Sequence, residues 1–213
     1  DGLEAVAKKA AGANSKVNVI RYADDFIITS DTKIALENRV KPAVAAFLKW
    51  RGLELSEEKT KITRIDEGFN FLGFNVRKYD GKFLIKPAKE NVKIFLAGIR
   101  KGVRSNWSST TEALIWLLNP KITGFSNYYR HTAAKKTFSY IDNQIYLAIR
   151  SWIQRRHRNK SWMWRKKKYF RRKGMARWIF FTKVKREGTQ SVLDLKKSAS
   201  TRIRPHVKIR AEA

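Results

Sequence analysis

Two adjacent aspartates, Asp24 and Asp25, are the residues of this chain whose type and spacing most clearly suggest chemistry. They stand between two short apolar runs rich in β-branched residues, 17–22 and 26–29, a pattern that predicts a β-hairpin with the acids at its turn. Carboxylates held in this way can bind Mg²⁺ through oxygen. Two such ions about 4 Å apart activate a 3′-hydroxyl and stabilise a leaving pyrophosphate. The alternative is a solvated turn, since aspartate favours turns in any case.

The segments around this hairpin predict a mixed helix and strand region. A helix is expected over 3–10, and a second over the apolar positions 36, 40, 44, 47 and 48, capped by Ser30 or Asp31 and kinked by Pro42. Gly52 is expected to follow the last turn of this second helix. Two further strands, 69–77 and 82–85, are expected around a tight turn at Asp80-Gly81.

Beyond Pro87 the apolar period becomes helical. Positions 92, 95, 96, 99 and 103 share one stripe. The run 109–112 fits a capping box that opens a helix, and we expect this helix to stop before Pro120. A short helical segment over 124–130 and a longer helix over 137–157 complete the prediction of a small helical bundle.

The charge of the chain points to nucleic acid as a partner. The 213 residues carry 47 Lys and Arg against 18 Asp and Glu, a net charge of +29, which argues against an ordinary metabolic enzyme. Residues 1–87 have 16 basic and 12 acidic residues, whereas residues 88–213 have 31 and 6, so a domain boundary is expected near Lys86-Pro87. The absence of cysteine excludes disulfides and thiolate zinc sites, and no apolar run approaches the length of a membrane span.

Residues 150–186 combine 16 Lys or Arg with no acid and with many aromatic residues. Basic side chains bind phosphates, and aromatic rings stack on unpaired bases, so this region predicts RNA binding. The alternative is a solvated charged face over a tryptophan core, to which Trp152 and Trp178 would belong. Beyond residue 187 the apolar density falls, and the alternating run 202–210 is expected to be an extended linker lying along RNA or DNA.

Four blocks in chain order carry a resemblance to a known family. The run 22–25, Tyr-Ala-Asp-Asp, resembles the Tyr-x-Asp-Asp motif of reverse transcriptases in the form common among group II intron-encoded proteins. The run 52–60, Gly-Leu-Glu-Leu-Ser-Glu-Glu-Lys-Thr, is similar to their next block, and 71–74, Phe-Leu-Gly-Phe, to the block at the primer end. The runs 124–130 and 138–142 resemble the maturase region, also called domain X or thumb.

The resemblance implies an RNA-directed DNA polymerase that also binds intron RNA to promote splicing and intron mobility, or retrohoming. Asp24 and Asp25 would be catalytic ligands of two Mg²⁺ ions, and Lys59 would act as general acid or neutralise the triphosphate. Tyr22 would lie near the primer–template and Leu72 with Gly73 would support the primer end, unless Leu72 is a core residue and Lys59 a solvated one. The residues expected to bind RNA are Tyr129, Arg130, Arg155, Arg156, Arg158, Lys160, Arg165, Lys166, Lys167, Lys168, Arg171, Arg172 and Lys173.

The family pattern is incomplete in these residues. A third carboxylate and the fingers lie upstream in the family, and the acids before Tyr22, Asp1 and Glu4, do not match them. We therefore expect a missing upstream fingers and palm segment, and no polymerisation by this chain alone. The expected partners are intron RNA, target DNA, an RNA template with a DNA primer, and dNTP, with no membrane. The expected location is the bacterial cytoplasm, in a ribonucleoprotein, or an organelle.

The fold class expected is α+β in three parts. Residues 1–87 would form the C-terminal part of a reverse-transcriptase palm, 88–186 an all-α thumb or maturase bundle, and 187–213 a basic extended tail. No Cys-containing endonuclease domain is expected within these residues. One alternative is a non-catalytic maturase-type RNA-binding splicing factor that keeps the two aspartates unused. Another is an unrelated basic RNA-binding or ribosomal-type protein.

Overall fold

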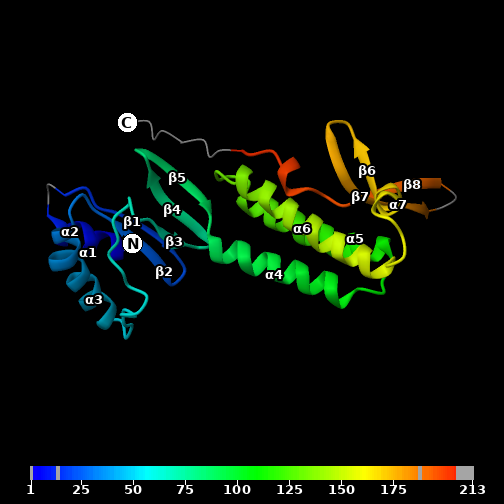
Figure 1. The fold of residues 1–213 in the computed structure, drawn as a ribbon. Coiled ribbons are helices and arrows are strands. Elements are labelled where there is room, and N and C mark those ends of the chain that lie inside the picture. The colour runs from blue at the N-terminus through cyan, green and yellow to red at the C-terminus, as the bar shows by residue number, and fades with distance from the viewer. Residues whose placement is uncertain (1, 13–14, 187–188, 205–213) are drawn as a thin grey trace. The chain divides into compact units, whose positions relative to one another are not determined.

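The structure of the chain is a computed structural model that describes residues 2–12, 15–186 and 189–204 (Figure 1). The chain divides into two compact units, unit 1 spanning Asp1–Arg64 and unit 2 spanning Ile65–Ala213. The predicted boundary near Pro87 marks a change of charge and lies inside unit 2, because the strand that ends at Pro87 leads directly into the helices of that unit. The fold is mixed helix and sheet, as the α+β prediction expected.

Unit 1 packs helices against a two-stranded hairpin. Its elements are α1 (Gly2–Ala11), β1 (Asn18–Tyr22), β2 (Asp25–Thr29), α2 (Lys33–Ala35), the π-helical turn η1 (Leu36–Val40) and α3 (Lys41–Lys49). The two predicted helices and the predicted hairpin are confirmed. Pro42 lies at the start of α3, directly after η1, where the wider π-helical turn tolerates the missing backbone donor. The buried core of the unit consists of Leu3, Ala7, Ala11, Val17, Val40 and Val44.

Unit 2 begins with a three-stranded antiparallel sheet in the order β3-β4-β5. The strands are β3 (Phe69–Phe71), β4 (Phe74–Tyr79) and β5 (Lys82–Pro87). The predicted turn at Asp80-Gly81 is confirmed, and both residues have the positive φ angles, 45° and 79°, that a two-residue hairpin turn requires. The single strand expected over 69–77 is wrong, since a second turn at Leu72-Gly73 separates β3 from β4.

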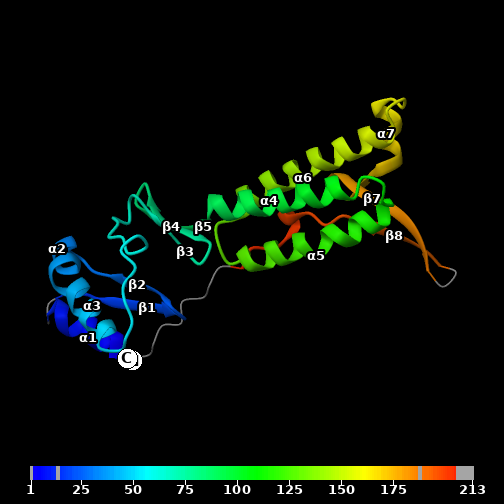
Figure 2. The ribbon, with the colours of Figure 1, turned by 90° about the horizontal axis from the view of Figure 1, so that it is seen from below.

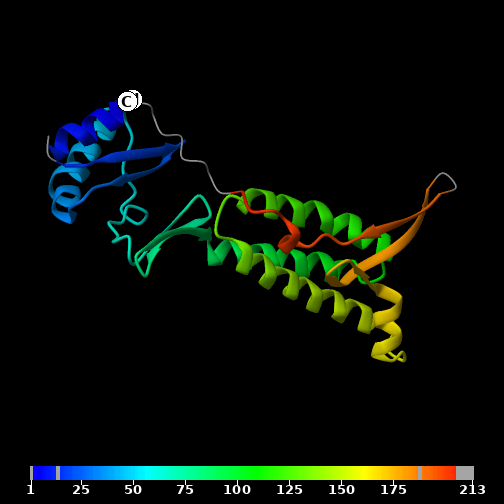
Figure 3. The ribbon, with the colours of Figure 1, turned by 90° about the horizontal axis from the view of Figure 1, so that it is seen from above.

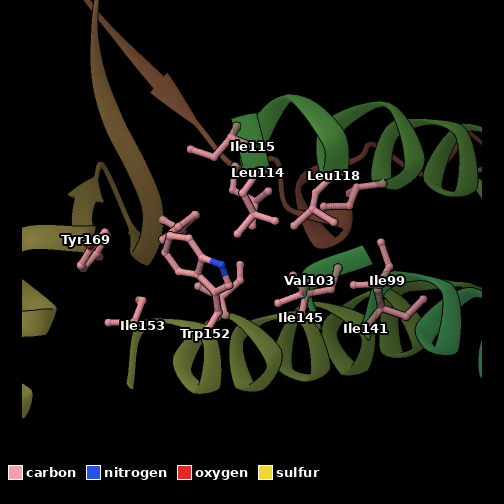
Figure 4. Close-up of a cluster of buried hydrophobic side chains, with 14 of the residues drawn as sticks. Ile99, Val103, Leu114, Ile115, Leu118, Ile141, Ile145, Trp152, Ile153 and Tyr169 are labelled. Carbon is pink, nitrogen blue, oxygen red and sulfur yellow. The ribbon is translucent and has the colours of Figure 1, made fainter. Parts of the chain in front are cut away.

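Three long helices carry the main hydrophobic core of unit 2. They are α4 (Lys89–Ser105), α5 (Thr111–Tyr129) and α6 (Lys135–Arg156). The predicted apolar stripe of α4 is confirmed, with Leu96, Ile99 and Val103 buried against the other two helices. Figure 4 shows side chains of all three helices converging, with the ring of Trp152 of α6 among them.

Helix α5 continues through Pro120, so the prediction that it stops before this residue is wrong. Thr110, not Ser109, caps the helix, and its side chain accepts a hydrogen bond from the backbone N–H of Ala113. Leu118 and Ile122 on either side of Pro120 are buried in the core, and this packing offsets the backbone hydrogen bond that proline removes. The predicted helical segment over 124–130 forms the last turns of the same helix.

The second sheet of unit 2 corrects the expectation of an all-α region up to residue 186. After α7 (Trp162–Tyr169), the chain forms β6 (Phe170–Lys173), β7 (Ala176–Arg186) and β8 (Thr189–Asp194), which pair in the order β6-β7-β8. The segment Ala176–Arg186 forms a strand because it is rich in aromatic and β-branched residues. Within unit 2 this sheet lies at the end of the helical bundle opposite β3–β5 (Figure 2).

The segment after β8 lies along the helical bundle and is not a free extended linker as far as residue 204. Figure 3 shows it following the helices, with the 3₁₀ turn η2 (Ser198–Ser200) in its path. The Asp142 carboxylate accepts the backbone N–H groups of Ser198 and Ala199, at 2.7 and 3.0 Å. The rest of the predicted basic tail, 205–213, lies outside the described residues. Among the residues described, no helix has the length and apolar character needed to cross a bilayer.

Candidate functional site

The tip of the hairpin β1–β2 holds the two predicted catalytic aspartates. Tyr22 pairs with Asp25, so Ala23 and Asp24 form a two-residue turn. Ala23 has a φ of 52°, the left-handed conformation that such turns require. The register is fixed by the strands on each side, because a slip by one residue would exchange the buried and exposed faces of the hairpin. The sequence therefore predicted correctly that the acids lie at a turn.

The two faces of this hairpin differ in what they contact. Val19, Phe26 and Ile28 pack against the core of unit 1. The opposite face carries the pairs Ile20 with Ile27 and Tyr22 with Asp25, and the side chains of Ile20 and Tyr22 are 56% and 65% exposed. Within unit 1 one face of the hairpin is thus anchored, while the face that bears Tyr22 and Asp25 is open to a partner.

Asp24 and Asp25 have the right donor chemistry for a magnesium site, but they do not form a complete one. Both side chains are exposed, and carboxylate oxygens are the ligands that Mg²⁺ prefers. No group of three His, Asp or Glu side chains that could hold a metal ion occurs among the described residues. A Mg²⁺ ion bound here would therefore need further oxygen ligands, from water, from substrate phosphates or from a carboxylate outside the described residues.

The third predicted catalytic residue, Lys59, lies in the segment between α3 and β3 and is exposed. The backbone N–H of Thr60 donates to the carbonyl oxygen of Ser56, which closes a turn around Lys59. Within the described part of the chain, no hydrogen bond or ion pair joins Lys59 to Asp24 or Asp25. Its catalytic role stays a prediction.

In unit 2, the predicted primer-binding turn Leu72-Gly73 is fixed by the end of α5. Both residues have positive φ angles, 49° and 79°. The hydroxyl of Tyr128 donates to the carbonyl oxygen of Leu72 at 2.8 Å, and the hydroxyl of Tyr129 donates to that of Gly73 at 3.0 Å. Phe74 stacks on the ring of Tyr128 with centroids 5.0 Å apart. Sequence reasoning missed the role of Tyr128, although the adjacent tyrosines at a helix end were a usable signal.

Tyr129 is not placed to contact RNA as predicted. Its side chain is only 3% exposed and packs among Phe125, Ala134 and Phe138. Burial raises the pKa of its hydroxyl, and the neighbouring Tyr128 raises it further, so the group remains a hydrogen-bond donor. Tyr129 positions the Leu72-Gly73 turn, and the neighbouring Arg130 is half-buried, with its carbonyl oxygen bound to the N–H of Arg204.

A cluster of cations covers the end of α6, α7 and β6, and we call it the basic surface. Its exposed members are Arg155, Arg156, Arg158, Lys160, Lys167, Lys168, Arg172 and Lys173. Lys160 and Lys168 lie over the ring of Trp164, with Nζ at 5.6 and 4.8 Å from the ring centroid. No acidic residue interrupts this stretch of sequence. Cations beside an exposed aromatic ring are suited to phosphates and unpaired bases.

Two predicted RNA-binding arginines are engaged within the fold. The guanidinium of Arg171 donates two hydrogen bonds to the carboxylate of Asp194, with the Nε contact at 2.7 Å. Burial raises the pKa of Asp194, but the hydrogen bonds and charge of Arg171, together with those of Lys173 at 3.4 Å, outweigh burial and leave the pKa lowered. Arg165 is half-buried and donates to the carbonyl oxygen of Arg158. Arg171 is therefore a structural ion-pair residue and not a free phosphate ligand.

His157 links the end of α6 to α7 beneath the basic surface. Its Nε2 lies 2.6 Å from the hydroxyl of Tyr169, and its ring contacts Trp164 edge-on with centroids 5.0 Å apart. Burial lowers the pKa of His157, and the positive charges around it lower the pKa further. The Nε2 of a neutral imidazole can accept a hydrogen bond from the Tyr169 hydroxyl, so His157 supports the surface without adding a charge.

Comparison with known proteins agrees with the order of these features along the chain. Residues 2–76 match the family described as reverse transcriptase (RNA-dependent DNA polymerase), and residues 92–170 match the group II intron, maturase-specific domain. Two curated relatives, both named group II intron-encoded protein LtrA, come from Lactococcus lactis subsp. cremoris and its strain MG1363. Each is 27% identical over 146 residues, covering 54% of this chain and 24% of the relative. The chain thus spans about a quarter of the length of these relatives.

Proposed function

Since the chain belongs to the group II intron-encoded reverse transcriptases and maturases, we propose that it supplies the end of the palm and the thumb or maturase region of an RNA-directed DNA polymerase and maturase. Residues 1–87 complete the palm, and the thumb or maturase region begins at 88 and includes the strand β8 that pairs with β7. The observation that carries this proposal is the position of Asp24 and Asp25 at the tip of a hairpin whose inner face is anchored in a core.

In the proposed polymerase, the chain's own residues bind and orient the reacting groups. Asp24 and Asp25 contribute carboxylate oxygens to a two-ion Mg²⁺ site, and a third carboxylate comes from an upstream palm segment. When bound, the ions supply charge stabilisation to nucleotidyl transfer. Tyr22 contacts the primer–template. The Leu72-Gly73 turn, which is held by the hydroxyls of Tyr128 and Tyr129, supports the primer end. Lys59 neutralises the triphosphate of the dNTP.

The proposed maturase function rests on the basic surface. Phosphate contacts from its exposed arginines and lysines supply affinity for intron RNA through the release of counterions. Binding at this surface stabilises the folded intron and so favours its splicing. The complex of protein and intron RNA then brings the polymerase to target DNA. Intron RNA, target DNA, template RNA and primer DNA are thus the proposed partners.

A second candidate is a splicing factor without polymerase activity. Among the described residues the basic surface has a full set of exposed cations, whereas the aspartates lack a third acidic partner. In this alternative the chain binds intron RNA and the hairpin plays no chemical role. The two candidates differ in whether Asp24 is needed for any activity.

Primer extension distinguishes them. The chain would be combined with an upstream fingers and palm segment, a DNA primer and an RNA template. We expect Mg²⁺-dependent extension that is abolished by Asp24→Ala but retained by Asp31→Ala, a matched control on an exposed aspartate just after β2. The chain without the upstream segment should be inactive. Extension that survives Asp24→Ala would overturn the metal assignment, and RNA binding without any extension would favour the second candidate.

RNA binding is tested by its dependence on salt. Changing Lys167, Lys168 and Arg172 together to Gln should weaken intron RNA binding and reduce the slope of log K against log salt by about 0.7 for each lost single-strand phosphate contact. The matched control changes Lys9, Lys16 and Lys49 of unit 1, which are also exposed, to Gln and removes the same charge. Equal effects in both triple variants would mean that net charge alone matters.

A further inference from the structure

A β-bulge between β6 and β7 places one tryptophan in an unusual conformation. Arg171 pairs with Ile179 and Lys173 pairs with Ala176, so two residues of β7, Arg177 and Trp178, face a single residue of β6. Trp178 has a φ of 61°, which is disfavoured for a bulky side chain and persists only where the surroundings hold it. Bulges of this kind redirect a side chain and occur next to functional sites.

The ring of Trp178 forms part of the wall of a cavity between α6 and the second sheet. The cavity has a volume of about 410 Å³, which is in the range of small-ligand pockets. Tyr146 and Phe170 line it with Trp178, and their ring centroids lie 5.5 to 6.2 Å apart. Trp178 is 37% exposed, so the aromatic wall reaches the surface. Such a pocket is suited to a flat, weakly polar ring.

The charges around this cavity favour an anionic ligand. Arg177 and Lys196 line the cavity and are exposed. Lys166, on α7, lies over the ring of Trp178 with Nζ at 3.9 Å from the centroid. The acid that lines the cavity, Asp142, already accepts two backbone N–H groups and is tied to the chain itself. An aromatic wall with a cationic rim matches a nucleotide, whose base is flat and whose phosphates are charged.

We propose that this cavity receives one unpaired nucleotide of the bound RNA. The base stacks against Trp178, and its edge meets Tyr146, whose ring stands at 66° to that of Trp178. The phosphates on either side of the base contact Arg177 and Lys196. This inference rests on the proposed RNA-binding function and adds to it a site for a single base. The basic surface supplies affinity for any RNA, whereas the cavity selects RNA that has a nucleotide free to leave the helix.

The test uses two RNA hairpins of equal length, one fully paired and one with a single bulged 2-aminopurine. The full chain should bind the bulged hairpin about 10-fold more tightly in a fluorescence anisotropy titration, in line with the stacking of one base on an aromatic side chain. The fluorescence of 2-aminopurine should fall on binding, because stacking quenches it. Trp178→Gly should remove both the preference and the quenching.

Trp178→Gly is a sharp variant because glycine adopts a positive φ without strain. The relief of the positive φ offsets only part of the packing lost with the ring, which contacts Tyr146, Trp162 and Phe170. The titrations are therefore run below the thermal unfolding midpoint of the variant, so that a loss of binding is not a loss of folding. Trp116→Ala, at a half-exposed tryptophan of α5, is the matched control and should keep both signals. Arg177→Gln provides a second variant at an exposed position and should weaken binding of the bulged hairpin more than that of the paired one.

The outcomes separate this inference from the proposed function. If the unchanged chain binds both hairpins equally, or if Trp178→Gly keeps the preference and the quenching, the cavity is not a nucleotide site and RNA binding by the basic surface stands. If Trp178→Gly weakens the binding of both hairpins alike, the ring contributes to the binding of any RNA and the inference is overturned. If the unchanged chain binds neither hairpin, the proposed RNA binding fails and the cavity assignment fails with it.

Discussion

The hydroxyl of Tyr129 donates a hydrogen bond to the carbonyl oxygen of Gly73, 56 residues earlier in the chain, at a distance of 3.0 Å. The backbone N–H of Ala88 donates to the same oxygen at 2.9 Å, and the hydroxyl of Tyr128 binds the carbonyl of Leu72. The end of α5 therefore fixes the turn between β3 and β4 from outside the sheet. In the proposed polymerase, this contact couples the primer-supporting turn to the helical bundle that follows it.

Changing Tyr129 to Phe removes one donor and leaves the ring packing intact. We expect the free energy of unfolding to fall by about 1 kcal/mol, the usual net contribution of a hydrogen bond, since Ala88 still satisfies the Gly73 oxygen. The change is measured by urea denaturation. Tyr140→Phe, at an exposed tyrosine of α6, should alter it by less than about 0.5 kcal/mol. Equal effects of the two substitutions would contradict a role for the Tyr129 hydroxyl.

Replacing Gly73 by Ala tests how tightly this turn is enclosed. Gly73 and Gly81 have the same φ of 79°, so alanine is strained at both. A Cβ at Gly73 would lie 2.9 Å from the Asn91 amide nitrogen and 3.0 Å from the Tyr129 hydroxyl, whereas a Cβ at Gly81 would meet nothing within 4 Å. We expect Gly81→Ala to cost about 1 kcal/mol of stability and Gly73→Ala about 1–3 kcal/mol more, from overpacking. Equal losses of stability in urea denaturation would mean that the side chains of Asn91 and Tyr129 move aside for the new Cβ at little cost.

The local features of this fold were predictable because each depends on residues close in sequence. The hairpin around Asp24 and the turn at Asp80-Gly81 follow from alternating apolar residues and turn chemistry, and the long helices follow from apolar stripes. The hydrogen bond from Tyr129 to Gly73 was not predictable, because it joins residues that are 56 positions apart and that no local pattern relates. The end of α5 was predicted wrongly, since Pro120 is read as a break unless the packing on both sides of it is known.

The second sheet of unit 2 was missed for a different reason. The many lysines and arginines of 165–186 predict a nucleic-acid-binding surface but no particular secondary structure. The signal for a strand is the alternation of β-branched and charged residues near the end of β7. The emphasis on charge also placed Arg171 among the RNA ligands. Its partner, Asp194, lies 23 residues further on and meets it only once β8 pairs with β7 and β7 with β6.

Arg171 and Arg172 form a matched pair for separating stability from RNA binding. Arg171 is bound to Asp194, whereas Arg172 is exposed and its Nε contacts the carbonyl oxygen of Gly174. Arg171→Ala should lower the free energy of unfolding by about 2 kcal/mol, because the half-buried Asp194 carboxylate loses two hydrogen bonds from a charged donor and keeps only the longer contact with Lys173, at 3.4 Å. Arg172→Ala should leave stability within about 0.5 kcal/mol and weaken RNA binding. Urea denaturation and anisotropy titrations measure the two effects, and the reverse pattern would contradict the assignment.

The state of His157 makes the stability of unit 2 depend on pH. Burial lowers the pKa of this histidine in the folded chain below the value of 6.5 expected of the unfolded chain. The charges that lower the pKa further come from Lys168, Arg156, Arg165 and Lys160. As pH falls through 6.5, the unfolded chain takes up the proton first, so unfolding is favoured. The stability that neutral His157 contributes is therefore fully present above pH 6.5 and is lost as pH falls toward the lowered folded pKa.

Changing His157 to Gln should remove this dependence. The free energy of unfolding, measured by urea denaturation at pH 7.5, 6.5 and 5.5, should fall with pH in the unchanged chain by more than in the variant. Burial raises the pKa of Asp142, which has the opposite sign and makes the fold more stable as pH falls. Both chains share that contribution, so the difference between them isolates His157. Parallel pH profiles would mean that the imidazole titrates alike in the folded and unfolded chains, and that its contact with Tyr169 does not depend on the neutral form.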